Sequence, residues 1–470
     1  MKLFSRRIHM VGIGGTGMSS AARLLLAGGC KLSGSDSTAS GVTAEMARIG
    51  AMVSIGHSRE NIPDGCDLVV TTAAARPDNP EVVEAKKRNL HIIKYARLVG
   101  LMMRDRMGIG VAGTHGKTTT SSMLAEVLRF ASLKPSYIIG GKIVGHRQYD
   151  CAGSGQFFVA EACEYDRSFL SLCPTYSIIT NVEPDHLDYY GSKEALYEAF
   201  KQYLLMMPSH GMALIGGDSA AAVEAARAAR CRIMTYGLGE HCDWRVRIHQ
   251  STNGISSFEL AGPQTINIEI SLPGEHNIIN AAGVAALAAS LGVKRDVIAA
   301  GLAGFQGVER RFQMLTPGMS ISVIDDYAHH PTEIAAVLRG ARNWFPGRRL
   351  WVVFQAHQHS RTRAFFEDFA QSLTLADRVT IAKIFSVRET EYDRMSVNGG
   401  DIAGRLYQLS TESEYLPDFR SIEYLLDSES SKGDVIIIMG AGDIYKVGHS
   451  FAQTLKEKAY GGVSAVKAAV

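Results

Sequence analysis

A lysine at the end of a glycine-rich turn is the first residue of this chain whose setting suggests chemistry. Lys117 follows the apolar run IGVAG, and the sequence after it has a helical composition. In such a turn the backbone N–H groups cradle phosphates, the lysine ammonium reaches the β and γ oxygens, and the next hydroxyl binds Mg²⁺. The strict motif has a glycine five positions before Gly116, where this chain has Val111. We predict an ATP site formed by Gly113, Thr114, His115, Gly116, Lys117, Thr118 and Thr119.

Two later strand ends carry residues that could bind the same metal ion. Glu161 ends the apolar run FFVAEA, and His186 follows the run SIITNV. The carboxyl ends of strands in an open parallel sheet face the ligand crevice. We therefore predict a metal site of Thr118, Glu161 and His186. Glu164 and Asp166 stay open, because an ordinary solvated loop explains these two residues equally well.

A second glycine-rich turn lies near the start of the chain. Gly12, Gly14 and Gly17 form GxGxxG between a predicted strand and a predicted helix, and Asp36 follows about twenty residues later, at the end of the next strand. The turn predicts a diphosphate at a helix N-terminus. By itself it leaves three interpretations open: a nicotinamide or flavin dinucleotide, another nucleotide diphosphate, or a purely structural turn.

Polar residues also follow three strands in the last third of the chain. They lie in VIDDYAHHPTE at 323–333, VFQAHQHSRTR at 353–363 and MGAGDIY at 439–445. Because the ends of parallel strands meet at one edge of a sheet, these clusters predict one wall of a site. The adjacent Arg310 and Arg311 could neutralise a transferring phosphoryl group or could be ordinary surface arginines.

Three α/β segments are predicted to position these residues. Short apolar strands alternate with helical stretches from the N-terminus to about residue 100, again from about residue 107, and a third time after the 242–272 region. In that region residues alternate at period two around Asn253-Gly254, which predicts antiparallel strands. We place domains at 1–104, 105–313 and 314–470, and expect residues 461–470 to form a loose tail.

Composition narrows the class of protein. The 470 residues carry a formal net charge of only +2, so nothing in the charge demands nucleic acid as a partner. No window reaches the length of about 18 apolar residues that a membrane span needs, and we predict no membrane insertion. The seven cysteines are scattered without CxxC spacing, which predicts reduced thiols in a cytoplasmic protein.

An ordered set of motifs carries a resemblance to a known family. GIGGTGMSSAA, AGTHGKTTTSSM, VAEACEYDRSFL, TNVEPDHLDYY, LPGEHNIINA, FQGVERRFQ, DDYAHHPTE and MGAGD, spread over residues 8–446, resemble the successive motifs of the Mur ligases. The best match is the branch that adds L-alanine. The resemblance implies an α/β fold of three domains: an N-terminal Rossmann-like parallel sheet, a central P-loop ATPase domain with a small antiparallel sheet, and a C-terminal Rossmann-like domain.

The resemblance also implies a reaction. ATP phosphorylates the lactyl carboxylate of UDP-N-acetylmuramate, and the amine of L-alanine then displaces phosphate from this acyl phosphate, in peptidoglycan precursor synthesis. The first glycine turn would hold the UDP-sugar and the second ATP with Mg²⁺, and the third domain would bring the amino acid and close over the nucleotide. A monomer or weak homodimer is expected.

Site residues follow from the matched motifs. The implied catalytic residues are Lys117, His186, Arg310 and His329. The implied UDP-sugar contacts are Gly12, Gly14, Gly15, Gly17, Met18, Ser19 and Asp36. The implied adenine-side contacts are His276, Asn277 and Asn280, with Asp326 at the ribose and Arg310 at the γ-phosphate. The implied amino-acid contacts are Tyr327, His329, His330, His357 and Arg361.

Two departures from the family pattern concern specificity and metal binding. Where the family usually has FQPHRYSR, this chain has FQAHQHSR, so Gln358 replaces an arginine that holds the amino-acid carboxylate. A neutral amide cannot make that charge-assisted bidentate contact, and Arg361, His357 or His359 must contribute more. Lys201 resembles the carbamylated lysine of other branches, but a plain helical lysine is the simpler interpretation.

Three alternatives stay open. A ligase that attaches a preformed tripeptide to UDP-N-acetylmuramate during wall recycling would need a wider pocket in the third domain. A nicotinamide-dependent oxidoreductase would use the first glycine turn but has no need of Lys117 and its distant acids. A non-catalytic UDP-sugar sensor would be expected to lack the DDYAHHP cluster, which is present here.

Overall fold

The computed structural model describes residues 6–72, 74–146, 150–252, 254–387 and 389–467. The chain forms two compact units. The first comprises residues 1–247, 258–268 and 279–305, and the second comprises residues 248–257, 269–278 and 306–470. The first unit holds the five-stranded sheet and most of the ten-stranded sheet, and the second unit holds the six-stranded sheet.

Five parallel strands form the N-terminal sheet, in the order β3-β2-β1-β4-β5. Ile8 and Met10 of the central strand belong to one buried cluster, whereas Val11 belongs to another with Val69, so both faces of the sheet are covered. The elements are β1 (Arg7–Val11), α1 (Thr16–Ala27), β2 (Lys31–Asp36), α2 (Gly41–Arg48), β3 (Met52–Ile55), η2 (Arg59–Asn61), β4 (Leu68–Thr71), α3 (Pro80–Lys87), β5 (His91–Lys94) and α4 (Tyr95–Arg104).

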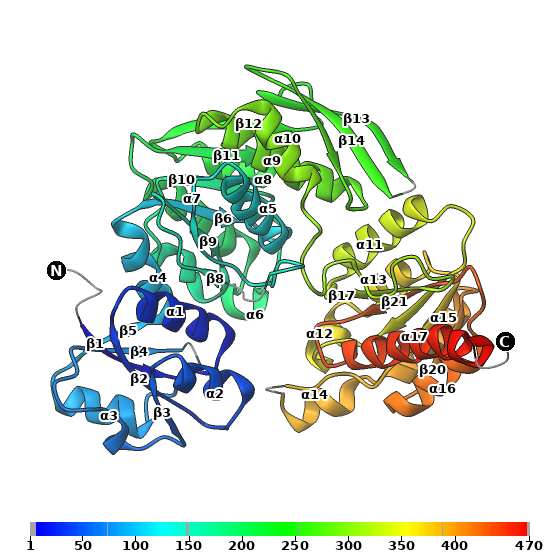
Figure 1. The fold of residues 1–470 in the computed structure, drawn as a ribbon, viewed down its shortest axis with the longest axis horizontal. Helices are drawn as coiled ribbons and strands as arrows, with labels where there is room; N and C mark the ends of the chain where they lie inside the picture. The colour runs from blue at the N-terminus through cyan, green and yellow to red at the C-terminus, as the bar shows by residue number, and fades with distance from the viewer. Residues whose placement is uncertain (1–5, 73, 147–149, 253, 388, 468–470) are drawn as a thin grey trace. The chain divides into compact units, whose positions relative to one another are not determined.

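Ten strands form the central sheet, in the order β15-β14-β13-β12-β11-β10-β6-β9-β7-β8 (Figure 1). Strands β6, β9, β10, β11 and β12 pair in parallel, and β8 is antiparallel to β7. The strands are β6 (Met107–Ala112), β7 (Ser136–Ile138), β8 (Asp150–Cys151), β9 (Phe157–Ala162), β10 (Tyr176–Ile179), β11 (Met212–Gly216), β12 (Arg232–Gly237), β13 (Trp244–Thr252), β14 (Ile255–Ala261) and β15 (Ile266–Ile270).

The predicted antiparallel region corresponds to the last three of these strands. Thr252 ends β13 and Ile255 starts β14, and a loop this short can join neighbouring strands only when they run antiparallel. Asn253 of the predicted turn lies outside the described residues. The helices of the central region are α5 (Lys117–Phe130), η3 (Tyr165–Ser171), α6 (Leu187–Tyr190), α7 (Lys193–Leu205), α8 (Ala220–Ala226), α9 (Glu275–Ser290) and α10 (Arg295–Ala303).

The sheet of the second unit has the order β16-β17-β21-β18-β19-β20, with only β16 antiparallel to its neighbour. Buried clusters lie on both of its faces, and α17 packs on β17 and β21 (Figure 1). The elements are β16 (Gln313–Met314), β17 (Ser322–Asp326), α11 (Pro331–Trp344), β18 (Leu350–Phe354), α12 (His359–Ala364), α13 (Phe366–Leu373), β19 (Arg378–Ile381), α14 (Glu391–Ser396), α15 (Gly399–Gln408), β20 (Glu412–Tyr415), α16 (Phe419–Glu429), β21 (Val435–Met439) and α17 (Tyr445–Lys467).

The predicted fold class is confirmed, with a parallel N-terminal sheet and mixed central and C-terminal sheets. The prediction of a loose tail is wrong for residues 461–467, because these residues continue helix α17. The two glycines at 461–462 disfavour a helix by about 1 kcal/mol each relative to alanine but do not block its hydrogen bonds, as a proline would. Residues 468–470 lie outside the described part of the chain, and the three domain boundaries stay a prediction.

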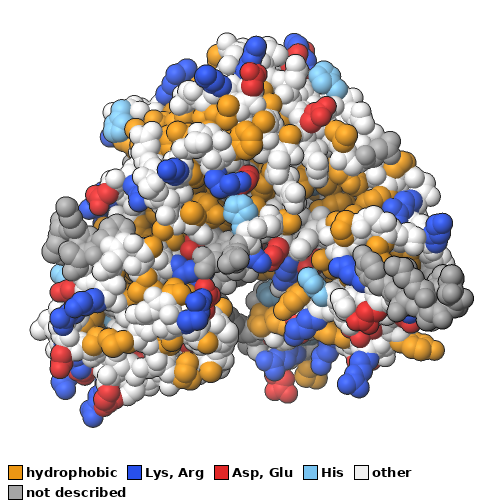
Figure 2. Space-filling model, in the orientation of Figure 1, with side chains coloured by type: hydrophobic (Ala, Val, Ile, Leu, Met, Phe, Trp, Pro, Cys, Tyr) orange, Lys and Arg blue, Asp and Glu red, His pale blue; other side chains and the backbone are white. Residues whose placement is uncertain are grey.

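Three further observations concern the helices, the cysteines and the surface charge. Among the helices of the described residues, none is long and apolar enough to cross a membrane. All seven cysteines lie within the described residues and are free thiols. Acidic and basic side chains are interspersed on the face shown in Figure 2, as expected for a formal net charge of +2.

Candidate active site

The second glycine turn joins β6 to α5 in the first unit. Gly113 has a φ of +139° and Gly116 a φ of +80°, both in the region that favours glycine. A Cβ atom on Gly113 would lie 2.0 Å from the Thr180 Oγ1 atom, and one on Gly116 would lie 2.7 Å from Asn280 Oδ1. No side chain caps the start of α5, so its backbone N–H groups stay available to a phosphate.

The end of β10 holds this turn in place. His115 N donates to Asn181 Oδ1 at 2.9 Å, and Thr180 Oγ1 donates to His115 O at 2.6 Å. Thr114 Oγ1 donates to Glu183 O at 3.0 Å. Because β6 and β10 are neighbouring parallel strands, their carboxyl ends bring these segments together.

The Lys117 ammonium lies inside the turn. Its Nζ atom donates to Gly113 O at 2.6 Å, to Thr114 O at 2.9 Å and to Glu164 Oε1 at 3.0 Å. Burial alone would lower the pKa of Lys117, but the Glu164 carboxylate and other nearby acids outweigh burial and raise this pKa above its usual value. The lysine therefore stays charged, and only 1% of the Glu164 side chain is exposed.

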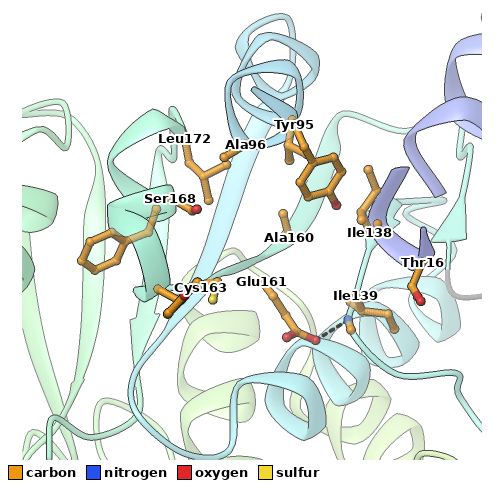
Figure 3. Close-up of a pocket in the computed structure, with 15 residues that line it drawn as sticks. Thr16, Tyr95, Ala96, Ile138, Ile139, Ala160, Glu161, Cys163, Ser168 and Leu172 are labelled. Carbon is orange, nitrogen blue, oxygen red and sulfur yellow. Dashed lines mark hydrogen bonds between the residues drawn. The ribbon is translucent and has the colours of Figure 1, made fainter. Parts of the chain in front are cut away.

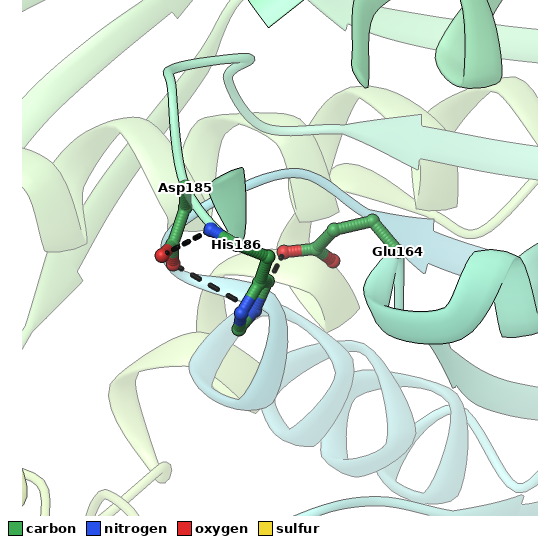
Figure 4. A group of neighbouring side chains, drawn as sticks. All are labelled: Glu164, Asp185 and His186. Carbon is green, nitrogen blue, oxygen red and sulfur yellow. Dashed lines mark hydrogen bonds and ion pairs between the residues drawn. The ribbon is translucent and has the colours of Figure 1, made fainter. Parts of the chain in front are cut away.

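Glu164, Asp185 and His186 form a cluster beside Lys117 (Figure 4). His186 Nε2 lies 3.9 Å from Glu164 Oε1 and 3.7 Å from Asp185 Oδ2. One ligand atom from each residue lies within 4.8 Å of the others, which suits a metal ion. His186 has a φ of +52°, a conformation that costs a non-glycine residue energy and often marks functional sites.

The predicted metal residues divide between two places. His186 belongs to the cluster, whereas the Glu161 carboxylate accepts hydrogen bonds from Gly140 N and Ser121 Oγ. Thr118 is half-buried in the first turn of α5. The sequence left the role of Glu164 open, three residues after Glu161 at the same strand end, and indicated no ligand role for Asp185.

Glu161 also lines a cavity of about 370 Å³ between the first glycine turn and the central sheet. The side chains of Tyr95 and Glu161 project into it, and Thr16 and Gly17 of the first turn form part of its wall (Figure 3). Apolar residues, among them Val99 and Phe169, make up most of the remaining wall. The cavity therefore lies between the first glycine turn and the end of β9, where Glu161 is placed.

The first glycine turn is organised by Asp36. Gly14 N donates to Asp36 Oδ2 at 2.9 Å, so this predicted UDP-sugar residue holds the turn itself. Gly15 precedes α1 without a side-chain cap, which leaves helix N–H groups for a diphosphate. The side chains of Met18 and Ser19 are buried, so a contact from these residues to the UDP-sugar would come from their backbone.

Asn280 borders the ATP turn through Gly116. Asn277 Nδ2 donates to Pro273 O at 2.7 Å, and His276 lies against Gly274. The predicted adenine-side role of these three residues stays a prediction.

In the second unit, Arg310 is held by its surroundings. Its guanidinium donates to Gly440 O at 2.7 Å and lies 4.9 Å and 4.6 Å from the ring centroids of Tyr327 and Tyr445. Arg310 Nε lies 3.6 Å from Asp325 Oδ2, and the residue has a φ of +61°. These contacts fix the guanidinium within its own unit, and its predicted role at the γ-phosphate stays a prediction.

Two buried carboxyls end β17. Burial raises the pKa of Asp325 to about 6, although Arg310 opposes the shift. Burial likewise raises the pKa of Asp326 to about 6. Asp326 accepts from Phe312 N and Ala328 N, each at 2.7 Å, and so fixes the segments on either side of the strand. The predicted ribose contact of Asp326 stays a prediction.

The histidines after β17 differ in their surroundings. Burial, helped by Arg361 and Arg311, lowers the pKa of His329 to about 4, so its imidazole is neutral at neutral pH. His329 Nδ1 lies 3.1 Å from Tyr327 O, which favours the tautomer with its proton on Nδ1. His330 Nδ1 instead accepts from Thr332 N and caps α11.

The chain matches known proteins along nearly its whole length. It matches the Mur ligase family catalytic domain over residues 7–107, the Mur ligase middle domain over residues 111–288, and the Mur ligase glutamate ligase domain over residues 310–442. A UDP-N-acetylmuramate–L-alanine ligase of Lachnospira eligens is 40% identical over 451 residues, 94% of this chain and 96% of the relative. The ligase of that name from Desulforamulus reducens is 37% identical over 458 residues, 96% and 98% of the two chains.

Solved structures of Mur ligases are also similar to this chain. The crystal structure of UDP-N-acetylmuramate-alanine ligase from Thermotoga maritima is 29% identical with a TM-score of 0.79, covering 96% of this chain and 100% of that chain. A murein peptide ligase of Psychrobacter arcticus, 24% identical with a TM-score of 0.68 over 96% and 99% of the two chains, shares the fold. The chain belongs to the Mur ligase family.

Proposed function

We propose that this protein is an ATP-dependent ligase that joins L-alanine to the lactyl carboxylate of UDP-N-acetylmuramate in peptidoglycan precursor synthesis. The observation that carries the proposal is the end-to-end match, at 37–40% identity, with relatives that bear this activity in their names. The turn around Lys117 and the cluster beside it support the ATP-dependent step. Since ATP is the energy source, we place the reaction in the cytoplasm.

The first step is proposed to form an acyl phosphate. The lactyl carboxylate attacks the γ-phosphorus of ATP and ADP leaves, so that a poor electrophile gains a good leaving group. Lys117, held by two carbonyls of its turn, would neutralise charge on the migrating phosphoryl group, and the uncapped N-terminus of α5 would hold the other phosphates. The protein contributes mainly position and charge.

The residues beside Lys117 fit Mg²⁺ in part. Two carboxylates supply the oxygen ligands that the ion prefers, and His186 can donate an imidazole nitrogen. Glu164, Asp185 and His186 would hold the ion, with Thr118 and Glu161 as the further ligands predicted from the sequence. When bound, Mg²⁺ would neutralise phosphate charge. Glu164 would then have to share its carboxylate between the ion and Lys117.

The second step is proposed to form the amide. The amine of alanine attacks the acyl carbon and phosphate leaves. Arg361 and His357 would hold the alanine carboxylate, and the neutral His329 imidazole offers Nε2 as a hydrogen-bond acceptor for the amine. Arg310, Asp325 and Asp326 keep the wall around Tyr327 rigid.

Phosphate release from ATP and Mg²⁺ with UDP-N-acetylmuramate, one amine at a time, tests the proposal. The amines are L-alanine, glycine, L-serine and the tripeptide L-Ala-γ-D-Glu-diaminopimelate. Strong stimulation by L-alanine is expected. Stimulation by the tripeptide alone would assign the protein to the wall-recycling branch. If none of the four amines stimulated phosphate release, the ligase assignment would be contradicted.

A further inference from the structure

A short segment of the second unit lies directly against the loop that carries His357. This bracing segment comprises residues 385–387 and 389–393. Phe385 N donates to Ala356 O and Gln358 N donates to Phe385 O, each at 2.9 Å. These two bonds and the parallel bridge between His357 and Phe385 continue the pairing of β18 with β19 beyond the strands. The backbone of the bracing segment therefore sets the position of the His357 backbone.

Glu389 is the side chain that connects the bracing segment to the start of α12. Its Oε2 lies 2.8 Å from His359 Nδ1 and accepts from Ser386 Oγ at 2.9 Å. Its Oε1 accepts from Ser360 N at 2.9 Å and from Ser360 Oγ at 3.2 Å. Only 2% of the Glu389 side chain is exposed, and a buried carboxylate is tolerated only when it is well hydrogen-bonded.

The charge state of Glu389 agrees with this geometry. Burial alone would raise the pKa of Glu389, but the hydrogen bonds from His359, Ser360 and Ser386 outweigh burial and lower the pKa below its usual value. Glu389 is therefore ionised at neutral pH. A charged acceptor makes stronger hydrogen bonds than a neutral one, so the start of α12 is held firmly.

The same segment occupies His359, which the sequence left open for binding the amino-acid carboxylate, and Gln358, which replaces the expected arginine. His359 is 8% exposed and pairs with Glu389 through Nδ1. Gln358 has a φ of +68°, a strained value for a residue other than glycine, and its Nε2 donates to Val387 O at 3.4 Å. Both residues serve the connection between the loop and the bracing segment.

His357 and Arg361 are in a different position. Within the described residues His357 Nδ1 is buried and has no hydrogen-bond partner, while its ring stacks on Phe385 at 5.7 Å between centroids and lies 6.2 Å from the His329 ring. Arg361 lies in the first turn of α12, directly after Ser360, whose N–H donates to Glu389. Any shift of the bracing segment would move both residues.

We propose that Glu389 is a positioning residue of the amino-acid site: it holds His359 and Ser360, and through them it fixes His357 and Arg361 for the carboxylate of the incoming amino acid. The inference rests on the proposed function. It also gives a physical reason why the site tolerates Gln358 in place of an arginine. Arg361 would then hold the carboxylate from a helix whose start is fixed by Glu389.

The test uses the full-length enzyme and the variant Glu389→Gln, with phosphate release measured against each substrate in turn. We expect the KM for L-alanine to rise about tenfold, because charge-assisted hydrogen bonds to the start of α12 are lost. The kcat and the KM for ATP should stay within about twofold of the wild type. A fall in kcat with no change in the KM for L-alanine, or no change at all, would overturn the proposal.

Two further variants make the result specific. Asp393→Asn is the matched control, since Asp393 Oδ2 accepts from Thr390 Oγ1 in the same segment, and its ion pair with α12, at 3.5 Å, is to the exposed Arg363 rather than to His359 or Ser360; its KM for L-alanine should not change. Ser386→Ala removes one donor to Glu389 and should raise this KM about two- to threefold, which keeps the proposal testable if Glu389→Gln fails to fold.

The wild-type enzyme separates the two hypotheses. If L-alanine does not stimulate phosphate release, the proposed substrate is wrong. The KM comparison is then made with whichever amine of the panel is active, and a selective rise in Glu389→Gln still supports the positioning role. If the wild type uses L-alanine and Glu389→Gln has the same KM for L-alanine as the wild type, only the positioning role is wrong.

Discussion

Around Lys117 in the first unit the buried charges are paired, whereas around Asp325 in the second unit burial shifts the titratable groups toward their uncharged forms. Lys117 has Glu164 at 3.0 Å, and the pKa of the lysine lies above its usual value. Asp325 is farther from Arg310, at 3.6 Å, and burial raises its pKa to about 6. His329 shifts in the corresponding direction, with a pKa lowered to about 4.

The difference corresponds to the chemistry proposed for each region. Moving a phosphoryl group requires fixed positive charge, which a paired lysine supplies without protonation changes. Receiving an amine requires neutral acceptors, which a desolvated imidazole supplies. Five variants test this contrast.

The largest effect is expected for Lys117→Ala. Phosphate release should fall by at least about a thousandfold, because the migrating phosphoryl group loses its fixed cation and Glu164 is left without that partner. Binding of UDP-N-acetylmuramate, measured by calorimetry, should stay largely intact, since Lys117 and the first glycine turn are separate. Loss of UDP-sugar binding in this variant would contradict the assignment of the two turns to different ligands.

Gly113→Ala tests whether the shape of the turn matters as much as its charge. The new Cβ would meet Thr180 Oγ1 at 2.0 Å, and the φ of +139° is strained for alanine. We expect the KM for ATP to rise at least about tenfold, measured by phosphate release. Gly404→Ala in α15 is the control, because nothing lies within 4 Å of its Cβ position. Equal behaviour of the two variants would show that the turn tolerates a side chain.

Asp325→Asn tests the second unit through stability. The folded pKa of about 6 exceeds the unfolded value of about 3.9, so this carboxyl contributes stability that is complete below pH 4 and is lost as the pH rises through 6. Asparagine does not titrate. The variant should therefore gain stability relative to the wild type as the pH rises from 4 to 7, by up to about 3 kcal/mol, measured as the melting temperature against pH.

Asp377→Asn should change the stability in the opposite direction. Hydrogen bonds from Arg342 and Leu350 N lower the pKa of Asp377 despite partial burial. The ionised carboxylate therefore contributes stability at a pH above its unfolded pKa. That stability is lost as the pH falls through the folded pKa. The asparagine variant should melt below the wild type at neutral pH. If the melting temperatures of Asp325→Asn and Asp377→Asn changed in the same direction relative to the wild type at neutral pH, the contrast between a carboxyl with a raised pKa and one with a lowered pKa would be contradicted.

Gln358→Arg should have the smallest effect. The variant introduces the arginine that the resemblance leads us to expect at this position, but the start of α12 is already held by Glu389. We expect the KM for L-alanine to change less than about threefold and kcat to stay unchanged, since the lost hydrogen bond from Gln358 Nε2 to Val387 O is long, at 3.4 Å. A tenfold fall in this KM would show that the missing arginine limits the natural enzyme.

Much of the candidate site followed from residue order alone. The glycine turns, Lys117 and the polar clusters after three strands were all predicted, because parallel strands bring their carboxyl ends to one edge whatever the details of packing. Glu164, Asp185 and Glu389 were not assigned a role. Their side chains act through contacts that depend on loop conformation, such as the positive φ of His186 and Gln358, which periodicity does not reveal.

The sequence by itself therefore determined the fold class, the family and the two glycine turns, because glycine spacing and apolar periodicity act locally and over short distances. Only the tertiary structure decided which carboxylate lies beside Lys117 and which histidine pairs with Glu389. It also decided that Asp325 lies near Arg310 in a buried setting where its pKa rises. Such pairings depend on burial and on distances between residues far apart in the chain, and no local pattern encodes them.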